Sequence, residues 1–426
     1  MVAMDELLIQ HIWQHALYDS RNMHTTDGLA VEVVAPGMQN SDAGPDFMDS
    51  RVKIGTTLWA GCVEIHRKSS DWNQHRHSEN RLYDNVILHV VVEHDMEICT
   101  RQGEPIPVLQ LKFHPKIEEN YQNLFQSRRW IPCEDKFGTV DSSLRSMWIE
   151  SLAVERLERK SIAIVEMLNE TNGHYNEVFY RLLAINFGFK TNAIPFEMLS
   201  RQLSLQTLTK ISGNPMAIEA ALFGQAGFLE SSPVDAYQEG LQKEFQLLKH
   251  RFVLTPIDKG LWKFFRLRPA NFPTIRLAQL SALLSRSVDF IGLIQGTKTV
   301  DQLHNYFLQP IGEYWQTHIS FGQKSKRRYV QLGTKSVEIV IINTVIPFLF
   351  VYGQQHDDDT LKQLAFEWLE DIQAEENTIV RKWQDLGADI QNARQSQAYL
   401  ELKNEYCNHH RCLECPIGCA LVADVG

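Results

Sequence analysis

The chain has 426 residues, of which 44 % are hydrophobic and 22 % are charged. This composition excludes a chain dominated by disorder, and the length predicts two or three domains that each bury a core. The formal net charge of −10 argues against nucleic-acid binding through the overall charge of the protein.

The N-terminal residues carry acidic side chains where a secretory signal peptide would carry basic ones, and no uninterrupted apolar stretch follows them. The most apolar run, residues 337–352, is too short to span a bilayer and is interrupted by Asn343 and Pro347. We therefore predict that this run is a buried helix. The expected protein is cytoplasmic, has no membrane association and keeps its cysteines reduced.

The first part of the chain has the pattern of a helix followed by several strands. Apolar side chains recur at helical spacing over residues 5–19, and short alternating or apolar runs then predict strands. The predicted strands are residues 29–34, 51–54, 58–66, 85–92 and 106–113. This order predicts a mixed α/β domain over residues 1–140.

From residue 142 onward the pattern becomes helical. The predicted helices are residues 142–170, 174–187, 194–210, 214–229, 233–253, 275–286, 299–307, 335–352, 358–372, 375–386 and 390–405. The expected fold class is α+β: an N-terminal mixed β-sheet domain, then a large and mostly helical region that ends in a cysteine loop. We divide that region into a helical domain, residues 141–336, and a helical segment, residues 337–426.

Basic side chains are concentrated in residues 251–336, which we call the basic block. It contains thirteen Lys or Arg and four Asp or Glu, so its formal net charge is +9. Such side chains neutralise phosphates, and neighbouring aromatic rings such as Phe272 can stack on unpaired bases. The alternative is a solvated surface that offsets the acidic remainder. The candidate substrate-binding residues, for a nucleic-acid partner, are Arg266, Arg268, Lys324, Lys326, Arg327 and Arg328.

The N-terminal domain contains a group of acids and a histidine typical of a metal site. Asp46 precedes a predicted strand, and Glu64 and His66 alternate on the next strand, so their side chains project from the same face. Two carboxylates of this kind can bind Mg²⁺ or Mn²⁺, which would activate a water molecule. We select Asp46 and Glu64 as candidate metal ligands and all three residues as candidate catalytic residues.

The order Pro45-Asp46 followed by Glu64-x-His66 is similar to the PD-(D/E)xK nuclease pattern. The helix and strands around it also fit the αβββαβ order of that fold. The resemblance implies that Asp46 and Glu64 bind the metal and that His66 stands where that family has a lysine. Histidine can accept a proton near neutral pH, so this departure is compatible with catalysis.

A second set of donors overlaps the first. His66, Asp71, His75 and His77 offer three imidazoles and one carboxylate, a set that suits zinc or iron. The alternative is a polar loop with Trp72 packed beneath it. Asp71, His75 and His77 are therefore secondary site candidates.

Four of the seven cysteines occur within thirteen residues near the end of the chain, with the spacing C-x4-C-x2-C-x3-C. Thiolates bind zinc and iron–sulfur clusters, and in a reduced compartment such a cluster predicts a metal centre. We predict a [4Fe–4S] cluster or a zinc ion that stabilises the C-terminal part of the chain. In the zinc alternative, His409 or His410 can replace one thiolate. The predicted ligands are Cys407, Cys412, Cys415 and Cys419.

Several longer motifs occur together in one order. They are Gly-Pro-Asp-Phe, Trp-Ala-Gly-Cys-Val-Glu-Ile-His, Val-Ile-Leu-His-Val-Val, Ile-Asn-Thr-Val-Ile-Pro and the cysteine loop. With them, essentially the whole chain resembles an uncharacterised bacterial family that is defined only as a domain of unknown function. That resemblance implies no reaction, substrate or cofactor.

The leading hypothesis is a metal-dependent hydrolase that acts on nucleic acid, a phosphodiesterase or nuclease, with a structural metal centre at its C-terminal end. One alternative is a non-enzymatic adaptor that binds nucleic acid or protein. Another is an iron–sulfur redox or sensor protein, although the chain has no G-x-G-x-x-G nucleotide fingerprint. The sequence does not predict the oligomeric state.

Overall fold

The computed structural model describes residues 6–326 and 328–426, and the chain divides into two compact units. Unit 1 contains the residues up to 149 together with 385–387 and 400–426, and unit 2 contains residues 150–384 and 388–399. From the sequence we expected three parts, residues 1–140, 141–336 and 337–426. The predicted segment 337–426 is shared between the units, because its last residues pack with the N-terminal part of the chain.

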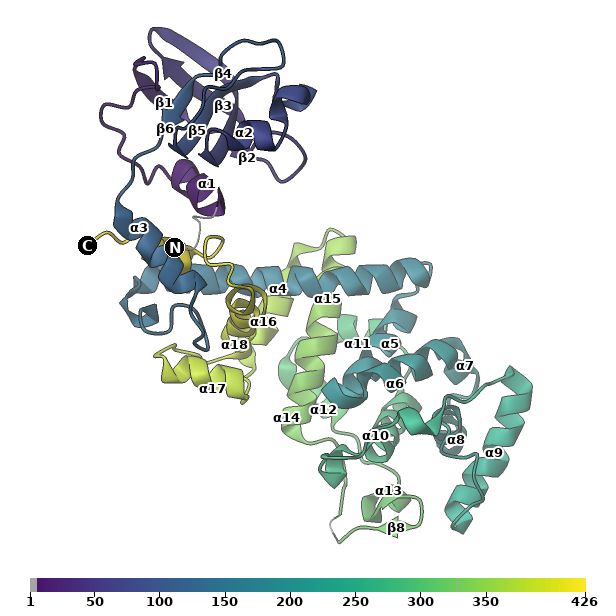
Figure 1. Ribbon diagram of the computed structural model, residues 1–426. Coiled ribbons are helices and arrows are strands. Elements are labelled where there is room, and N and C mark those ends of the chain that lie inside the picture. The colour runs from purple at the N-terminus through teal and green to yellow at the C-terminus, as the bar shows by residue number, and fades with distance from the viewer. Residues whose placement is uncertain (1–5, 327) are drawn as a thin grey trace. The chain divides into compact units, whose positions relative to one another are not determined.

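Unit 1 is built on a sheet of six strands (Figure 1). The strand order is β1-β3-β4-β5-β6, with β2 paired to β3. The β1–β3 and β3–β4 pairs are antiparallel, whereas β4–β5 and β5–β6 are parallel. The strands are β1 Val31–Ala35, β2 Met38–Gln39, β3 Phe47–Ile54, β4 Thr57–Lys68, β5 Val86–Glu93 and β6 Val108–Gln110.

Strand β4 is the central strand, and residues 61–66 within it are all buried. Helix α1, Glu6–Gln14, packs against β4 through an apolar face that includes Ile9 and Trp13. The helix ends earlier than predicted because Ala16 adopts a left-handed conformation, with φ of 50°, and Leu17 N–H then bonds back to the Ile12 carbonyl. The predicted first helical residue, Asp5, lies outside the described residues.

Three further helices of unit 1 are α2, Asp71–Gln74, α3, Pro115–Phe125, and α19, Pro416–Ala423. Helix α19 packs against α3. The Asn120 side-chain amide of α3 donates to the Asp424 carbonyl at 2.8 Å. These contacts fix the C-terminal residues to the first part of the chain.

Unit 2 is mostly helical, as the sequence predicted, and its boundary with unit 1 falls within α4. A two-stranded hairpin, β7 His318–Ser320 and β8 Gln323–Lys324, accompanies the helices. The helices are α4 Ser142–Glu170, α5 Tyr175–Phe187, α6 Phe189–Gln202, α7 Leu205–Lys210, α8 Pro215–Gln225, α9 Ala236–Phe252, α10 Pro273–Arg286, α11 Phe290–Gly296, α12 Val300–Phe307, α13 Glu313–Thr317, α14 Thr334–Val340, α15 Ile346–Gln355, α16 Asp359–Asp371, α17 Thr378–Asp385 and α18 Ala393–Glu401. The α+β class is thus confirmed.

The most apolar run forms α14, a π-helical turn over Ile341–Val345, and α15. By length and composition this helical stretch, Thr334–Gln355, is apolar enough to cross a membrane, but 72 % of its most apolar window is buried inside the protein. A core helix of a soluble protein has the same properties. The prediction of a buried helix is confirmed.

Candidate metal centres

The structure brings Asp46, Glu64 and His66 together within unit 1. Asp46 lies directly before β3, and its backbone N–H donates to Glu64 Oε2 at 3.0 Å. Glu64 and His66 lie two residues apart on β4, and Glu64 Oε1 is 3.5 Å from His66 Nε2. Both side chains are buried, with 4 % and 2 % exposure. The alternation along β4 therefore places them as the sequence indicated.

The Asp46 carboxylate is engaged on both oxygens. Its Oδ1 accepts from the Gln10 side-chain amide at 2.8 Å, and its Oδ2 accepts from the Ile65 backbone N–H at 2.9 Å. Burial raises the pKa of Asp46, and the adjacent Glu64 charge adds to the rise. Burial likewise raises the pKa of Glu64, whereas the Asp46 N–H partly opposes that rise. Asp46 thus connects α1, β3 and β4 beside the site.

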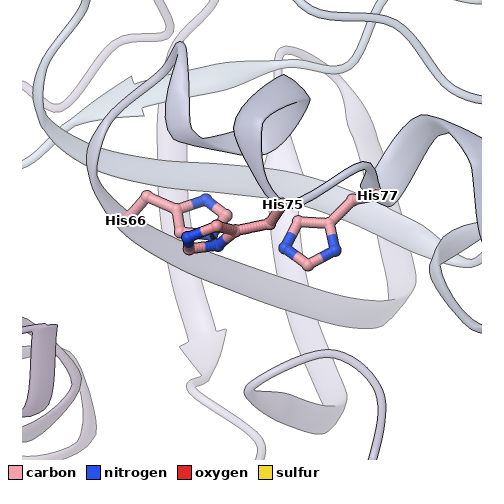
Figure 2. Close-up of side chains that lie close together, drawn as sticks. All are labelled: His66, His75 and His77. Carbon is pink, nitrogen blue, oxygen red and sulfur yellow. Dashed lines mark hydrogen bonds between the residues drawn. The ribbon is translucent and has the colours of Figure 1, made fainter.

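Two histidines contact Glu64, and a third contacts one of these two. His66 Nε2 lies 3.0 Å from His75 Nδ1, and His77 Nε2 lies 3.2 Å from Glu64 Oε1. Figure 2 shows the three imidazole rings grouped together, and their ligand atoms all lie within 4.8 Å of one another. We call His66, His75, His77 and Glu64 the histidine cluster. Three imidazoles and a carboxylate form a donor set typical of zinc and of divalent iron or manganese.

The loop after β4 presents two of these rings through a local turn. Helix α2 ends at Gln74 with His75 as its C-cap, and Arg76 then adopts a left-handed conformation with φ of 59° before His77 begins a 3₁₀ turn. Trp72 is fully buried beneath the loop, with its ring 5.3 Å from that of His77. The predicted packing of Trp72 beneath this loop is therefore observed, and the rings above it form the cluster.

His89 contacts the cluster, although the sequence analysis did not select it. It lies on β5, where the parallel register places it opposite Glu64, and its Nε2 is 2.8 Å from His66 Nδ1. The side chain is completely buried. The sequence feature that could have led to its selection is a single histidine inside the apolar strand sequence Val-Ile-Leu-His-Val-Val. A contact of this kind fixes the tautomer and the orientation of a ligand imidazole.

Two histidines of the cluster, His66 and His77, and the adjacent His89 are favoured in their neutral form, because burial lowers their pKa values. Burial, together with the neighbouring imidazoles, lowers the pKa of His66 to about 2, and burial lowers that of His89 to about 3. Burial also lowers the pKa of His77, whose Nε2 is buried without a hydrogen-bond partner. Neutral imidazoles with free lone pairs are what metal binding requires. The exposed side chain of His75 leaves one side of the cluster open to solvent.

Asp71 does not contribute to this donor set. Its Oδ2 accepts from the Lys68 backbone N–H at 2.9 Å, at the start of the helix that carries His75. The carboxylate beside the imidazoles is that of Glu64 instead. Asp71 therefore shapes the loop locally.

The four cysteines of the C-terminal loop lie in unit 1, and none of them is in a disulfide. A fifth cysteine of unit 1, Cys133, has a thiol whose pKa is raised by burial, and Cys415 and Cys412 add to that rise. Burial raises the pKa of all five thiols. Such thiols stay protonated near neutral pH unless a cation stabilises the thiolates. His409 is exposed, and His410 Nε2 bonds to the Ser127 carbonyl at 3.1 Å.

The candidate substrate-binding residues lie in unit 2. The side chains of Arg266, Arg268, Lys324 and Lys326 are exposed, and Phe265 beside Arg266 is 82 % exposed. Arg328 is also exposed and donates through Nε to Gln316 Oε1 at 3.0 Å. Arg327 lies outside the described residues.

A family model described as a protein of unknown function, DUF2851, matches residues 6–378. The chain belongs to this family. The matched range contains the histidine cluster, His89 and Cys133, and it ends before the C-terminal cysteine loop. No curated protein and no solved structure matches the chain.

Proposed function

We propose that this protein is a metal-dependent hydrolase that cleaves phosphodiester bonds in nucleic acid. The observation that carries the proposal is the convergence of three imidazoles and the Glu64 carboxyl group in the histidine cluster, which the exposed His75 opens to solvent. A divalent cation held by the histidine cluster would supply a Lewis acid and an activated water molecule.

The contacts around the cluster support this assignment of roles. His89 faces Nδ1 of His66 and leaves Nε2 directed toward His75 and Glu64. Asp46 holds the backbone of Ile65, which lies between the two donors on β4. The donors are therefore pre-positioned, and little rearrangement is needed when a cation binds. The imidazoles favour zinc, iron or manganese over Mg²⁺, which prefers oxygen ligands.

The sheet supports the nuclease form of the hypothesis. Strands β1, β3 and β4 are antiparallel neighbours and β5 runs parallel to β4, an arrangement compatible with the hypothesis. By the PD-(D/E)xK resemblance, Asp46 and Glu64 would correspond to the two metal-binding acids of that family. Because His66 replaces the lysine and adds a nitrogen donor, the ion would differ from the usual Mg²⁺.

The basic block supports nucleic acid as the substrate. The described candidate residues of this block, Arg266, Arg268, Lys324, Lys326 and Arg328, are exposed on unit 2, and the exposed ring of Phe265 lies beside Arg266. Exposed cations and an aromatic ring are typical of surfaces that track a phosphate backbone.

The proposal is tested by incubating the purified protein with single-stranded DNA, double-stranded DNA, RNA and bis(p-nitrophenyl) phosphate. Mn²⁺, Zn²⁺, Fe²⁺ and Mg²⁺ are each added to separate reactions. We expect cleavage of at least one nucleic acid that depends on the metal and is lost in Glu64→Gln. The control is Asp71→Asn, which leaves the donor set intact. Intact substrates with every metal, or equal cleavage by Glu64→Gln, would contradict the proposal.

A further inference from the structure

A buried arginine in unit 2 has no acidic partner. Arg276, on α10, is 5 % exposed. Its guanidinium donates to Gln279 Oε1 at 2.9 Å, to Asn271 Oδ1 at 2.7 Å and to Ser336 Oγ at 3.2 Å, and its Nε is buried without a hydrogen-bond partner. The guanidinium carbon also lies 4.1 Å from the centroid of the Phe189 ring. All of these partners are uncharged, and no carboxylate of the residues that the structure describes forms an ion pair with Arg276.

Other partly buried arginines of unit 2 are paired with acids. Arg181 has 17 % side-chain exposure, and its Nε lies 2.9 Å from Glu177 Oε1. Arg394, with 27 % side-chain exposure, is paired with Glu370. Arg276 is more buried than either, and this burial lowers its pKa to about 10. A buried charge is costly unless a charge of opposite sign compensates it. An anion near the guanidinium would supply that compensation.

The guanidinium lies beside the first turns of two helices. Ser336 is the third residue of α14, which begins the helical stretch Thr334–Gln355, and Asn271 lies two residues before α10. The N-cap residues of these helices, Gly333 and Phe272, form no side-chain hydrogen bond to the helix. The first N–H groups of a helix have no acceptor within the helix, and the helix dipole is positive at this end. The helix N-termini and the buried cation therefore favour an anion at the same place.

Asn271 and Ser336 connect the buried charge to the surface. Asn271 is exposed and Ser336 is partly exposed. A Cβ atom added to Gly333 would meet no atom within 4 Å, so the start of α14 is open to solvent. Because the oxygens of both side chains accept from Arg276, the Asn271 amide N–H groups and the Ser336 hydroxyl hydrogen remain available as donors. A surface anion would receive hydrogen bonds from groups that the guanidinium orients and polarises.

The location favours phosphate among the anions. It lies within the basic block, and the exposed Arg268 is held nearby, because the Asn271 N–H donates to the Arg268 carbonyl at 2.7 Å. The ammonium of Lys335 is paired with Glu376, so we do not count it among the donors. Phosphate oxygens carry strong negative charge and accept several hydrogen bonds at once, which suits a basic surface with N–H and O–H donors.

We propose that Arg276, Asn271 and Ser336, together with the first N–H groups of α14, form a phosphate-binding site in unit 2. The bound group is a phosphate of nucleic acid or a free phosphate, which present the same oxygens to the site. Phosphate binding does not depend on the histidine cluster of unit 1. Only the assignment of the phosphate to nucleic acid rests on the proposed function.

The test measures the binding of inorganic phosphate to the full chain by calorimetric titration, without added divalent metal and at constant ionic strength. We expect the wild type to bind phosphate, and Ser336→Ala to bind it at least about tenfold more weakly, because a hydrogen bond to a charged group is lost. The control Arg286→Gln removes an exposed charge at the other end of α10 and should leave the affinity unchanged. No binding to the wild type, or equal affinities of Ser336→Ala and the wild type, would overturn the proposal.

Asn271→Asp separates a binding role of Arg276 from a purely structural one. Asn271 is exposed, and the introduced carboxylate can accept from the guanidinium as the amide oxygen does, so the variant should fold. We expect its melting temperature to equal or exceed that of the wild type, because the carboxylate neutralises the buried charge. Phosphate affinity should fall at least about tenfold, because the carboxylate repels the anion. Unchanged phosphate affinity in Asn271→Asp would show that the anion does not bind beside Arg276.

A competition experiment identifies the source of the phosphate. Single-stranded DNA with a 5′-phosphate is added to the wild type in the presence of inorganic phosphate, again without divalent metal. We expect the DNA to displace inorganic phosphate from the site. Failure to displace it would overturn the assignment to nucleic acid and leave a site for free phosphate. Intact phosphate binding in a protein that cleaves no nucleic acid would contradict the proposed function alone.

Discussion

The histidine cluster and the C-terminal cysteine loop are both candidate metal sites in unit 1, but they are assembled differently. The histidine cluster comes from one strand and the loop after it, and the exposed His75 leaves it open to solvent. The cysteine loop lies near the other end of the chain, and its His410 contacts the Ser127 carbonyl in the segment after α3. An open set of nitrogen and oxygen donors suits chemistry on a substrate, whereas a set of sulfur donors that joins remote segments suits stabilisation.

The largest difference between the two sites should appear in His66→Ala. We expect this substitution to lower the hydrolytic rate by more than about 10²-fold, because it removes a direct metal ligand and the loss of an outer supporting partner alone costs about 10–100-fold. The rate per folded molecule is measured with the best metal and substrate. Cys407→Ser, by contrast, should lower thermal stability and leave this rate within about twofold. If His66→Ala and Cys407→Ser lose the hydrolytic rate to a similar extent, the histidine cluster and the cysteine loop do not have separate catalytic and structural roles.

His89→Gln tests whether the buried contact to His66 positions a metal ligand. We expect metal affinity at the histidine cluster to fall by about 10–100-fold, the usual effect of losing such a supporting partner. The affinity is measured by calorimetric titration of Mn²⁺ or Zn²⁺ into the metal-free protein. His15→Gln, a matched histidine substitution on a residue outside the cluster, should leave the affinity unchanged. Equal affinities in His89→Gln and the wild type would assign His89 to packing alone.

Arg266→Ala and Arg268→Ala address the substrate surface in unit 2. Each should reduce the salt dependence of nucleic-acid binding by about one unit in the slope of log K against log salt, if each side chain neutralises one phosphate. Binding is measured at several salt concentrations without catalytic metal. Metal affinity at the histidine cluster should not change. If the slope of log K against log salt is unaltered in the variant that carries both substitutions, Arg266 and Arg268 do not bind the nucleic acid.

Asp71→Asn should have the smallest effect. The asparagine side chain can still accept from the Lys68 N–H, so the loop should keep its shape. We expect metal affinity to stay within about threefold of the wild type and the free energy of unfolding to fall by less than about 1 kcal/mol. Loss of the metal in this variant would mean that Asp71 replaces Glu64 in the donor set.

The sequence was sufficient for features that depend on local spacing. The alternation of Glu64 and His66 predicted their common face, and the predicted helices and strands overlap observed ones, whereas α3, α11, α13 and the β7–β8 hairpin were not predicted. The choice of Glu64 over Asp71 was not predictable from spacing, because it depends on the turn of the Asp71 carboxylate back to the Lys68 N–H. His89 joins the cluster through strand pairing, and the segment after α3 meets the cysteine loop through tertiary packing. A single sequence carries no local signal for either kind of contact.

The most direct test of the central claim is an anomalous-scattering map from crystals of the protein grown with Mn²⁺, with data collected at the manganese and iron absorption edges. The account predicts one manganese peak within bonding distance of His66, His75, His77 and Glu64, separate from any iron peak at the C-terminal cysteine loop. A map in which the histidine cluster holds no metal while His66, His75 and Glu64 keep their mutual contacts would contradict the claim.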